Sequence, residues 1–160
     1  MRRMKVFMIT AGFLLTIPFF LPAQTAAELE AVLGTPAVSC TQAARFVLAS
    51  SGSAASTGGA ASGPISEGSA FEEVVARGWL KEAAPDDAIS LGKLSFLMMK
   101  AFSMKGGMMY KFFPGPRYAY RIMVSRNFIQ GAADPAMTVN GERFLLILGK
   151  VLSAEGEEQL

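Results

Sequence analysis

The sequence has 160 residues, of which 51% are hydrophobic and 18% charged, with a formal net charge of +2, one cysteine and no histidine. This length is sufficient for one domain with one modest core. The lack of histidine excludes His-based catalytic triads and His-ligated metal sites, and a single cysteine excludes an internal disulfide bond. We therefore expect a fold held together by packing, without a cofactor.

The N-terminal segment has the layout of a secretory signal peptide. Three cations among the first five residues precede an uncharged apolar run from Val6 to Leu21, and small residues follow. We assign residues 1–23 to the signal peptide, with cleavage after Ala23, and the protein to the bacterial periplasm or cell envelope. The alternative is an uncleaved anchor, which would be the only membrane contact expected of this chain. The run is short for a span of about 20 residues.

Helical patterns begin directly after this segment. Residues 24–50 are predicted to form a short helix over Ala26–Leu33 and a second helix over Thr41–Ala49. Residues 51–66 consist mostly of Ser, Gly and Ala, which offer little apolar area to offset the loss of chain entropy. We interpret this segment as a flexible linker or long loop.

Two similar helix-loop-helix segments follow, at residues 67–104 and 117–152. Each is predicted to have a short helix, a residue type that tolerates positive φ, an aromatic-aliphatic pair, a loop with Pro and Asp, a hydroxyl cap and a longer apolar helix. The residues given these structural roles are Gly78, Trp79 and Ser90 in the first segment, and Asn127, Phe128 and Thr138 in the second, with Asn140 as the alternative cap of the last helix.

The alignment of the two segments pairs Ile89–Met99 with Met137–Ile147, an offset of 48 residues. Val38–Leu48 is a fainter third copy that keeps only the cap and the second helix. The sequence thus predicts an all-α protein of about six helices, with two repeats after an N-terminal half-repeat. Residues 153–160 are expected to form a frayed acidic tail.

A connector at residues 105–116 joins the two repeats. Two glycines open it, and Pro114, Gly115 and Pro116 close it. Pro116 suits the first turn of the helix that follows. We expect these three residues to fix the turn between the repeats.

The second repeat resembles the S-layer homology (SLH) repeat of bacterial envelope proteins. The matching residues are Ile129-Gln130-Gly131, Asp134-Pro135, Met137-Thr138 and Glu142-Arg143-Phe144. Val139 stands where that family has a basic residue. The resemblance extends over about residues 67–152, and the chain is also similar to small exported spirochaete envelope proteins of unsettled function. It implies an SLH-like helical module that binds cell-wall polysaccharide or peptidoglycan.

Charge is distributed unevenly along the chain. Residues 24–90 contain 3 basic and 8 acidic residues, whereas residues 91–150 contain 9 basic and 2 acidic residues. Such asymmetry indicates that the C-terminal half meets an anionic partner, or that it is only a solvated surface. In an exported protein we expect a wall polymer or an envelope protein as partner, and no nucleic acid.

Cations and aromatics at the connector form the candidate binding surface. We predict that Lys111, Arg117, Tyr118 and Arg121 contact the ligand, because aromatic faces stack on sugars while Arg and Lys pair with carboxylates or phosphates. The alternative is that the aromatic side chains only pack one repeat against the next.

The leading hypothesis is a non-catalytic envelope protein that binds wall polymer or an envelope partner protein. One alternative is a structural subunit of a periplasmic assembly. Another is an enzyme, for which the sequence supplies few convergent polar groups. A cluster of five methionines between Met98 and Met109 is typical of an adaptable core or interface, and less often of Cu(I) binding.

Overall fold

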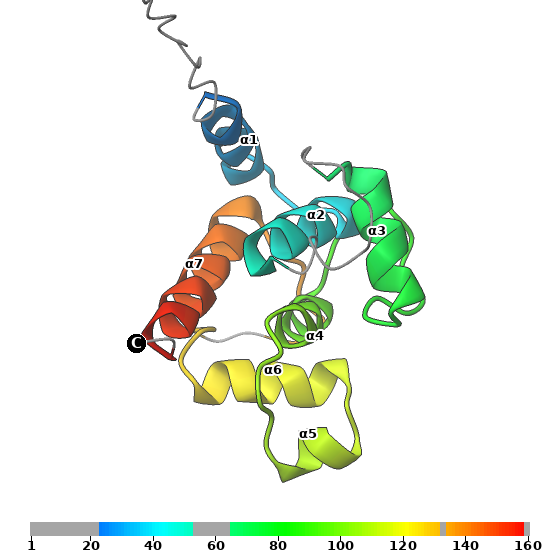
Figure 1. Cartoon of the computed structure of the whole chain (residues 1–160), viewed down its shortest axis with the longest axis vertical. Coiled ribbons are helices and arrows are strands. Elements are labelled where there is room, and N and C mark those ends of the chain that lie inside the picture. Colours follow the sequence, from blue (N-terminus) through cyan, green and yellow to red (C-terminus); the bar gives the residue numbers. More distant parts are fainter. Residues whose placement is uncertain (1–22, 53–64, 132–133, 159–160) are drawn as a thin grey trace, which may run out of the picture.

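The computed structural model describes residues 23–52, 65–131 and 134–158, and these residues form helices and no strand (Figure 1). The prediction of an all-α protein is confirmed. The helices are α1 (Ala23–Leu33), α2 (Cys40–Ser51), α3 (Glu67–Ala76), α4 (Leu91–Ala101), α5 (Met108–Phe112), α6 (Pro116–Ser125) and α7 (Gly141–Glu158).

Two predicted segments fall mostly outside the described residues. These are the signal peptide, of which only Ala23 is described as the first residue of α1, and the linker at residues 51–66. The ends of that linker belong to helices, because Ser51 is the last residue of α2 and Ser66 caps α3.

A ring of backbone hydrogen bonds lies at the centre of the fold. The amide of Val38 donates to the carbonyl of Val139 over 2.8 Å, Val139 donates to Ile89 over 3.1 Å, and Ile89 donates back to Val38 over 2.8 Å. All three side chains are fully buried. Because each residue lies two positions before the start of a long helix, the ring brings the starts of α2, α4 and α7 together.

A second set of bonds links the same three helix starts in the opposite circular order. The first amide of each long helix donates over 2.9 Å to a carbonyl in the loop before another long helix. These bonds are Cys40 to Asp87, Leu91 to Met137 and Gly141 to Thr35. Amides at a helix start lack partners inside their own helix, so these contacts satisfy them and close the circle.

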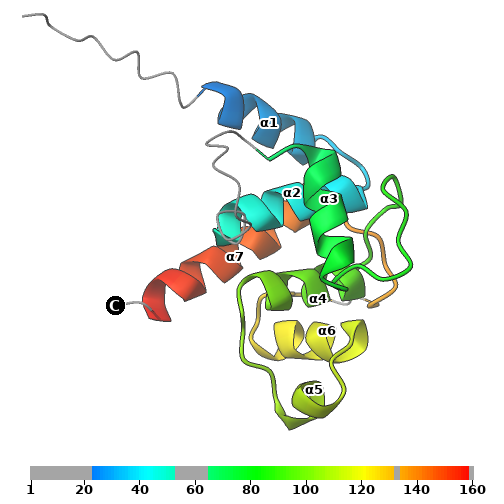
Figure 2. The same cartoon turned by 45° about the vertical axis from the view of Figure 1, so that its right-hand side comes forward.

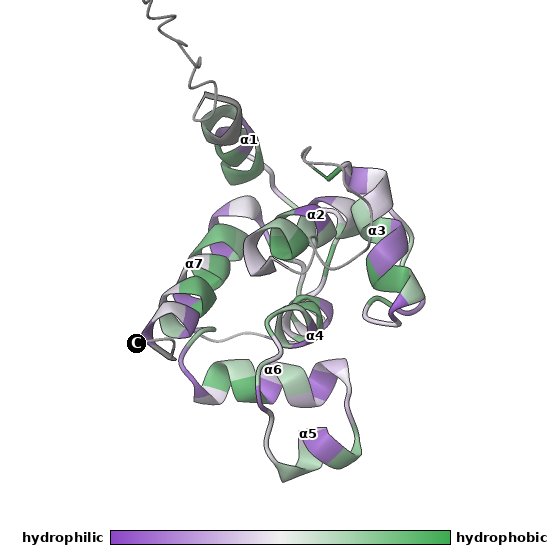
Figure 3. Ribbon diagram, viewed as in Figure 1, coloured by the Kyte–Doolittle hydropathy of each residue, from purple (hydrophilic) through white to green (hydrophobic). Residues whose placement is uncertain are grey.

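The shorter helices complete this arrangement. α3 packs on α2, α6 packs on α4, and α1 packs on α7, so each long helix carries the short helix of another segment (Figures 1 and 2). In Figure 3 hydrophobic and hydrophilic residues alternate along α3, α6 and α7, as expected for helices that bury one side. The core is one continuous cluster of buried side chains.

The structure corrects the predicted alignment of the two repeats. α4 begins at Leu91 and α7 at Gly141, an offset of 50 residues where the sequence alignment gave 48. Thr138 is therefore not the cap of α7. Asn140 caps this helix, because its Oδ1 accepts a hydrogen bond from the amide of Arg143 over 3.0 Å. Ser90 caps α4 as predicted.

The residues that end the short helices adopt left-handed backbone conformations. Gly78 has a φ of 70° and Asn127 a φ of 65°. The chain then turns back, so that Leu80, Phe128 and Ile129 are buried and Trp79 is half-buried.

We expect Gly78→Ala to lower the free energy of unfolding by about 1 kcal/mol, because a Cβ is disfavoured at positive φ. Gly68→Ala is the matched control, since its added Cβ meets no atom within 4 Å and its φ is not positive. This variant should be at least as stable as the parent protein. Denaturant unfolding of both variants tests the assignment, and equal stabilities would contradict it.

Two further segments differ from expectation. The connector at residues 105–116 contains α5, a short helix that the sequence analysis did not predict. The acidic segment from residue 153 was expected to be frayed, but α7 continues through it to Glu158. After Val151 this helix contributes no residue to the described buried core, so no apolar pattern in the sequence marks its last turns as helical.

Candidate functional site

α6 carries most of the predicted binding surface. Gly115 is its N-cap residue and Pro116 its first residue, and it buries Ala119 and Met123 against the core. The remaining face borders a surface hollow of about 590 Å³. The hollow is lined by Arg117, Tyr118, Tyr120, Arg121 and Pro135. We call it the α6 hollow.

The α6 hollow is positively charged. Arg117 and Arg121 are exposed, and among the residues that the structure describes no carboxylate lies within ion-pairing distance of either guanidinium. Guanidinium groups bind carboxylates and phosphates with two parallel hydrogen bonds, and a phenol ring offers a flat face to a sugar. The arrangement can therefore bind an anionic group beside a flat, weakly polar one.

The structure brings together three of the four predicted ligand contacts. Arg117, Tyr118 and Arg121 line the α6 hollow, whereas Lys111 is exposed on α5 and does not. Tyr120 and Pro135 join the group. Pro135 comes from the loop before α7, which the sequence places 14 residues away from Arg121.

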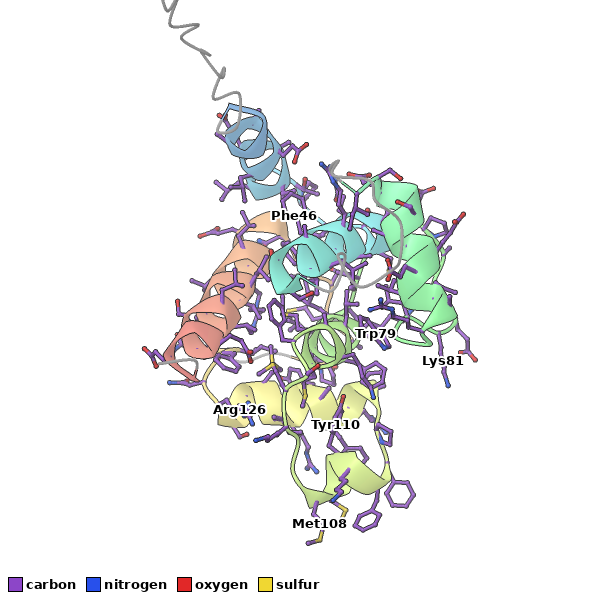
Figure 4. All side chains as sticks on the ribbon, in the orientation of Figure 1. Phe46, Trp79, Lys81, Met108, Tyr110 and Arg126 are labelled. Atoms are coloured by element: carbon purple, nitrogen blue, oxygen red, sulfur yellow. The ribbon has the colours of Figure 1, made fainter. Side chains whose placement is uncertain are left out.

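A second hollow, of about 430 Å³, lies between the end of α3 and one face of α4. Its lining combines four cations with aromatic rings and prolines. The principal residues are Arg77, Trp79, Lys81, Lys93, Phe96, Lys100, Pro114 and Pro116. We call it the α4 hollow. Figure 4 labels Trp79 between α3 and α4 and Lys81 near the end of α3.

Cations in the α4 hollow are held against aromatic rings. The guanidinium of Arg77 lies 4.9 Å from the centre of the Trp79 ring, and Arg77 also pairs with Glu73. The Lys100 ammonium lies 5.5 Å from the centre of the Phe96 ring. The cation–π contact holds the Lys100 charge in place without neutralising it. Arg77 is instead paired with a carboxylate.

The two hollows lie beside each other at Gly92. Its amide donates to the carbonyl of Pro135 over 2.8 Å, and a Cβ added there would lie 3.5 Å from Cβ of Pro116. Pro135 lines the α6 hollow and Pro116 lines the α4 hollow. One lining residue of each hollow therefore lies against Gly92.

The α4 hollow was not predicted from the sequence. Lys93, Phe96 and Lys100 follow the i, i+3, i+7 spacing that places side chains on one face of a helix. That spacing was readable in the sequence. What the sequence could not show is that Arg77 and Trp79, at the end of another helix, face the same space.

Tyr110 supports the far end of this region. Its ring packs edge-on against Phe96, with 6.2 Å between the ring centres, and its hydroxyl is buried without a hydrogen-bond partner among the described residues. Burial raises the pKa of the Tyr110 phenol above its usual range. A buried hydroxyl that makes no hydrogen bond costs free energy relative to its exposure to water.

We expect Tyr110→Phe to stabilise the protein by about 1 kcal/mol at neutral pH, because it removes this unpartnered hydroxyl. The gain should increase with pH. Folding raises the pKa of Tyr110, so the folded state keeps the phenol proton to a higher pH than the unfolded state does. As pH rises above the unfolded pKa, near 10, the unfolded chain loses this proton first and the protein with Tyr110 becomes less stable, whereas the variant with phenylalanine does not. Unfolding measured at pH 7 and pH 10.5 tests both points, and a less stable variant would contradict the assignment.

The other candidate chemistries gain no support from the arrangement of their residues. Cys40 is fully buried, and burial raises the pKa of its thiol, which disfavours the reactive thiolate. Met98 and Met99 lie in the core, whereas Met108 and Met109 are exposed on α5. In the described part of the chain, no group of three or more Cys, Asp or Glu residues could hold a metal ion.

Comparison of the chain with models of protein families, with characterised proteins and with solved structures found no match. The function is therefore inferred from the residues and geometry of this chain. Within the described residues, no helix combines the length and the apolar composition that spanning a membrane requires.

Proposed function

We propose that this protein is a non-catalytic, exported component of the bacterial cell envelope that binds an acidic cell-wall polymer. The observation that supports this most strongly is the convergence of Arg117, Arg121 and Tyr118 on one hollow, with both guanidinium groups free of carboxylates among the described residues. Peptidoglycan combines sugar rings with the carboxylates of its peptide stems, which matches that pair of chemistries.

The extent of the two hollows favours a polymer over a small molecule. The α6 hollow and the α4 hollow are neighbours, and together they present cations from two helices, α4 and α6, and from the segment that follows α3. Several weak charge contacts spaced along one surface suit a ligand with repeated charges, because each contact adds to the effective concentration for the next.

We also propose that the chain consists of three SLH-like helix-loop-helix units, α1–α2, α3–α4 and α6–α7. The circular order of the backbone ring and the matching placement of α1, α3 and α6 support this proposal. In that reading α1 supplies the short helix that the N-terminal half-repeat lacked in the sequence alignment. The α4 hollow then lies where the second and third units meet, and the α6 hollow lies on the third unit.

The binding proposal is tested by sedimentation with purified, lipid-free peptidoglycan sacculi. We expect the protein to pellet with sacculi in a saturable manner that weakens with added salt. Arg117→Glu combined with Arg121→Glu should weaken binding about tenfold or more, because two charge-assisted hydrogen bonds become repulsive contacts.

The matched control is Lys105→Glu with Lys111→Glu, which makes the same change in net charge outside both hollows. This variant should bind nearly as well as the parent protein. Equal losses in both double variants would show that binding depends only on net charge. No pelleting above that of an unrelated protein of equal charge would exclude the proposal.

A further inference from the structure

α5 exposes an unusual set of large apolar side chains. Met108 is 76% exposed, Met109 63%, Phe112 68% and Phe113 66%. We call these four residues the α5 tip. A contiguous apolar surface of this kind is uncommon on a monomeric protein and usually marks an interaction site. α5 lies at the end of the molecule opposite α1 (Figures 1 and 2), and Met108 points away from the body of the protein (Figure 4).

The exposure of the tip is built into the fold. Tyr110 is the one buried residue of α5, and its ring packs against Phe96 on α4. Gly106 permits this contact, because a Cβ there would lie 2.2 Å from Cδ1 of Tyr110. The guanidinium of Arg126 donates to the carbonyl of Lys105 over 2.7 Å and fixes the incoming chain. With Tyr110 turned inward, the neighbouring Met and Phe side chains must point outward.

Charges around the tip have one sign. Lys105 and Lys111 are exposed beside it, and the sequence from Ala88 to Ala133 contains seven Lys or Arg and no Asp or Glu. Large apolar side chains flanked by cations are typical of surfaces that enter the boundary between lipid headgroups and acyl chains. Lysine stems can lie along the apolar layer while their ammonium groups remain among anionic headgroups.

We propose that the α5 tip inserts into the interface of an anionic lipid membrane, with Lys105 and Lys111 among the headgroups. A second copy of this chain fits the tip less well. A symmetric contact through α5 would bring the lysines of both copies together around an apolar centre, and like charges there oppose association. Anionic lipid instead supplies both an apolar layer and opposite charge. This contact is separate from the proposed binding of wall polymer and from any contact made by the N-terminal run.

The test places a fluorescent reporter on the tip itself, because the apolar N-terminal run can also bind lipid. Trp79 is the only tryptophan in the sequence, so Phe112→Trp in a Trp79→Phe background gives a single reporter on α5. Vesicles contain phosphatidylcholine alone or with phosphatidylglycerol, and a fraction of the lipids carries bromine on the acyl chains to quench nearby tryptophan. The control reporter is Leu146→Trp in the same background, at an exposed position on α7.

With phosphatidylglycerol present, the tip reporter should shift to shorter wavelength and be quenched, and the α7 reporter should not change. In the protein with its native Trp79, Phe112→Ser with Phe113→Ser should weaken vesicle binding about tenfold. Lys105→Gln with Lys111→Gln should weaken binding to vesicles that contain phosphatidylglycerol, and should leave binding to vesicles of phosphatidylcholine alone unchanged. Leu146→Ser with Leu152→Ser, which removes exposed apolar side chains from α7, should leave binding unchanged.

Three results would overturn the proposal. One is an unchanged tip reporter while the protein binds vesicles, which would assign binding to another segment. Another is equal quenching of the tip and α7 reporters. The third is a wavelength shift that needs no lipid and grows with protein concentration, which would identify a second copy of the chain as the occupant.

Discussion

Gly141→Ala is expected to lower the free energy of unfolding by about 3 kcal/mol. A Cβ at this position would lie 1.6 Å from the carbonyl oxygen of Val32 and 2.6 Å from its carbonyl carbon. Both are backbone atoms, so no side-chain rotation can relieve the overlap. The end of α1 must move away from the start of α7. That movement also strains the hydrogen bond from the Gly141 amide to Thr35, one of the bonds that close the circle.

Gly149→Ala is the matched control for this prediction, because it makes the same substitution in the same helix. A Cβ at Gly149 meets no atom within 4 Å. Alanine is favoured over glycine inside a helix, so this variant should gain about 0.5–1 kcal/mol. Denaturant midpoints with unchanged m values would measure both effects. A Gly141→Ala loss below about 1 kcal/mol would show that α1 does not pack on α7 as described.

Phe144→Ala should cost about 4 kcal/mol. Phe144 is fully buried on α7, and its ring packs edge-on against Phe46 of α2 with 6.1 Å between the ring centres. Its removal leaves a cavity between two of the long helices, α2 and α7. The backbone ring limits how far these helices can move together, so the cavity cannot collapse completely.

Leu146→Ala, two residues further along α7, is the control for Phe144→Ala. Leu146 is 56% exposed, and alanine is as good a helix former as leucine, so the change should be within about 0.5 kcal/mol. Thermal or denaturant unfolding distinguishes the two outcomes. Similar losses in both variants would mean that α7 does not bury the face described here.

Much of the fold was predictable because its signals are local. Ser90 before Leu91 and Pro116 at the start of α6 mark helix starts, and the structure has them there. Gly78 and Asn127 are residue types that tolerate positive φ, and both adopt it. Each of these assignments needs only a few neighbouring residues.

The alignment at Thr138 failed for a physical reason. Thr138 and Asn140 are both good caps, and the sequence alone does not show which amide lacks a partner. The ring of backbone bonds decides, because it places Val139 opposite Val38 and Ile89 and so starts α7 at Gly141. Pairing between segments 50 or more residues apart leaves no mark in local composition.

The candidate site was predictable in part. Arg117, Tyr118 and Arg121 share one helix, so their proximity follows from helical spacing. The grouping with Lys111 assumed that the connector continues the same surface. The inward turn of Tyr110 directs Lys111 elsewhere, and this turn depends on Gly106 and on the position of Phe96 on α4.

The most direct test of the proposed function is a nuclear magnetic resonance titration of the isotope-labelled protein with soluble fragments of peptidoglycan. We expect saturable shifts at the amides of residues 117–121 and around Pro135, with smaller shifts at Lys93, Phe96 and Lys100 in the α4 hollow. Arg117→Glu with Arg121→Glu should remove the shifts at α6. Shifts that do not saturate, or that cluster on α1 or α7, would contradict the assignment of the α6 hollow as the binding site.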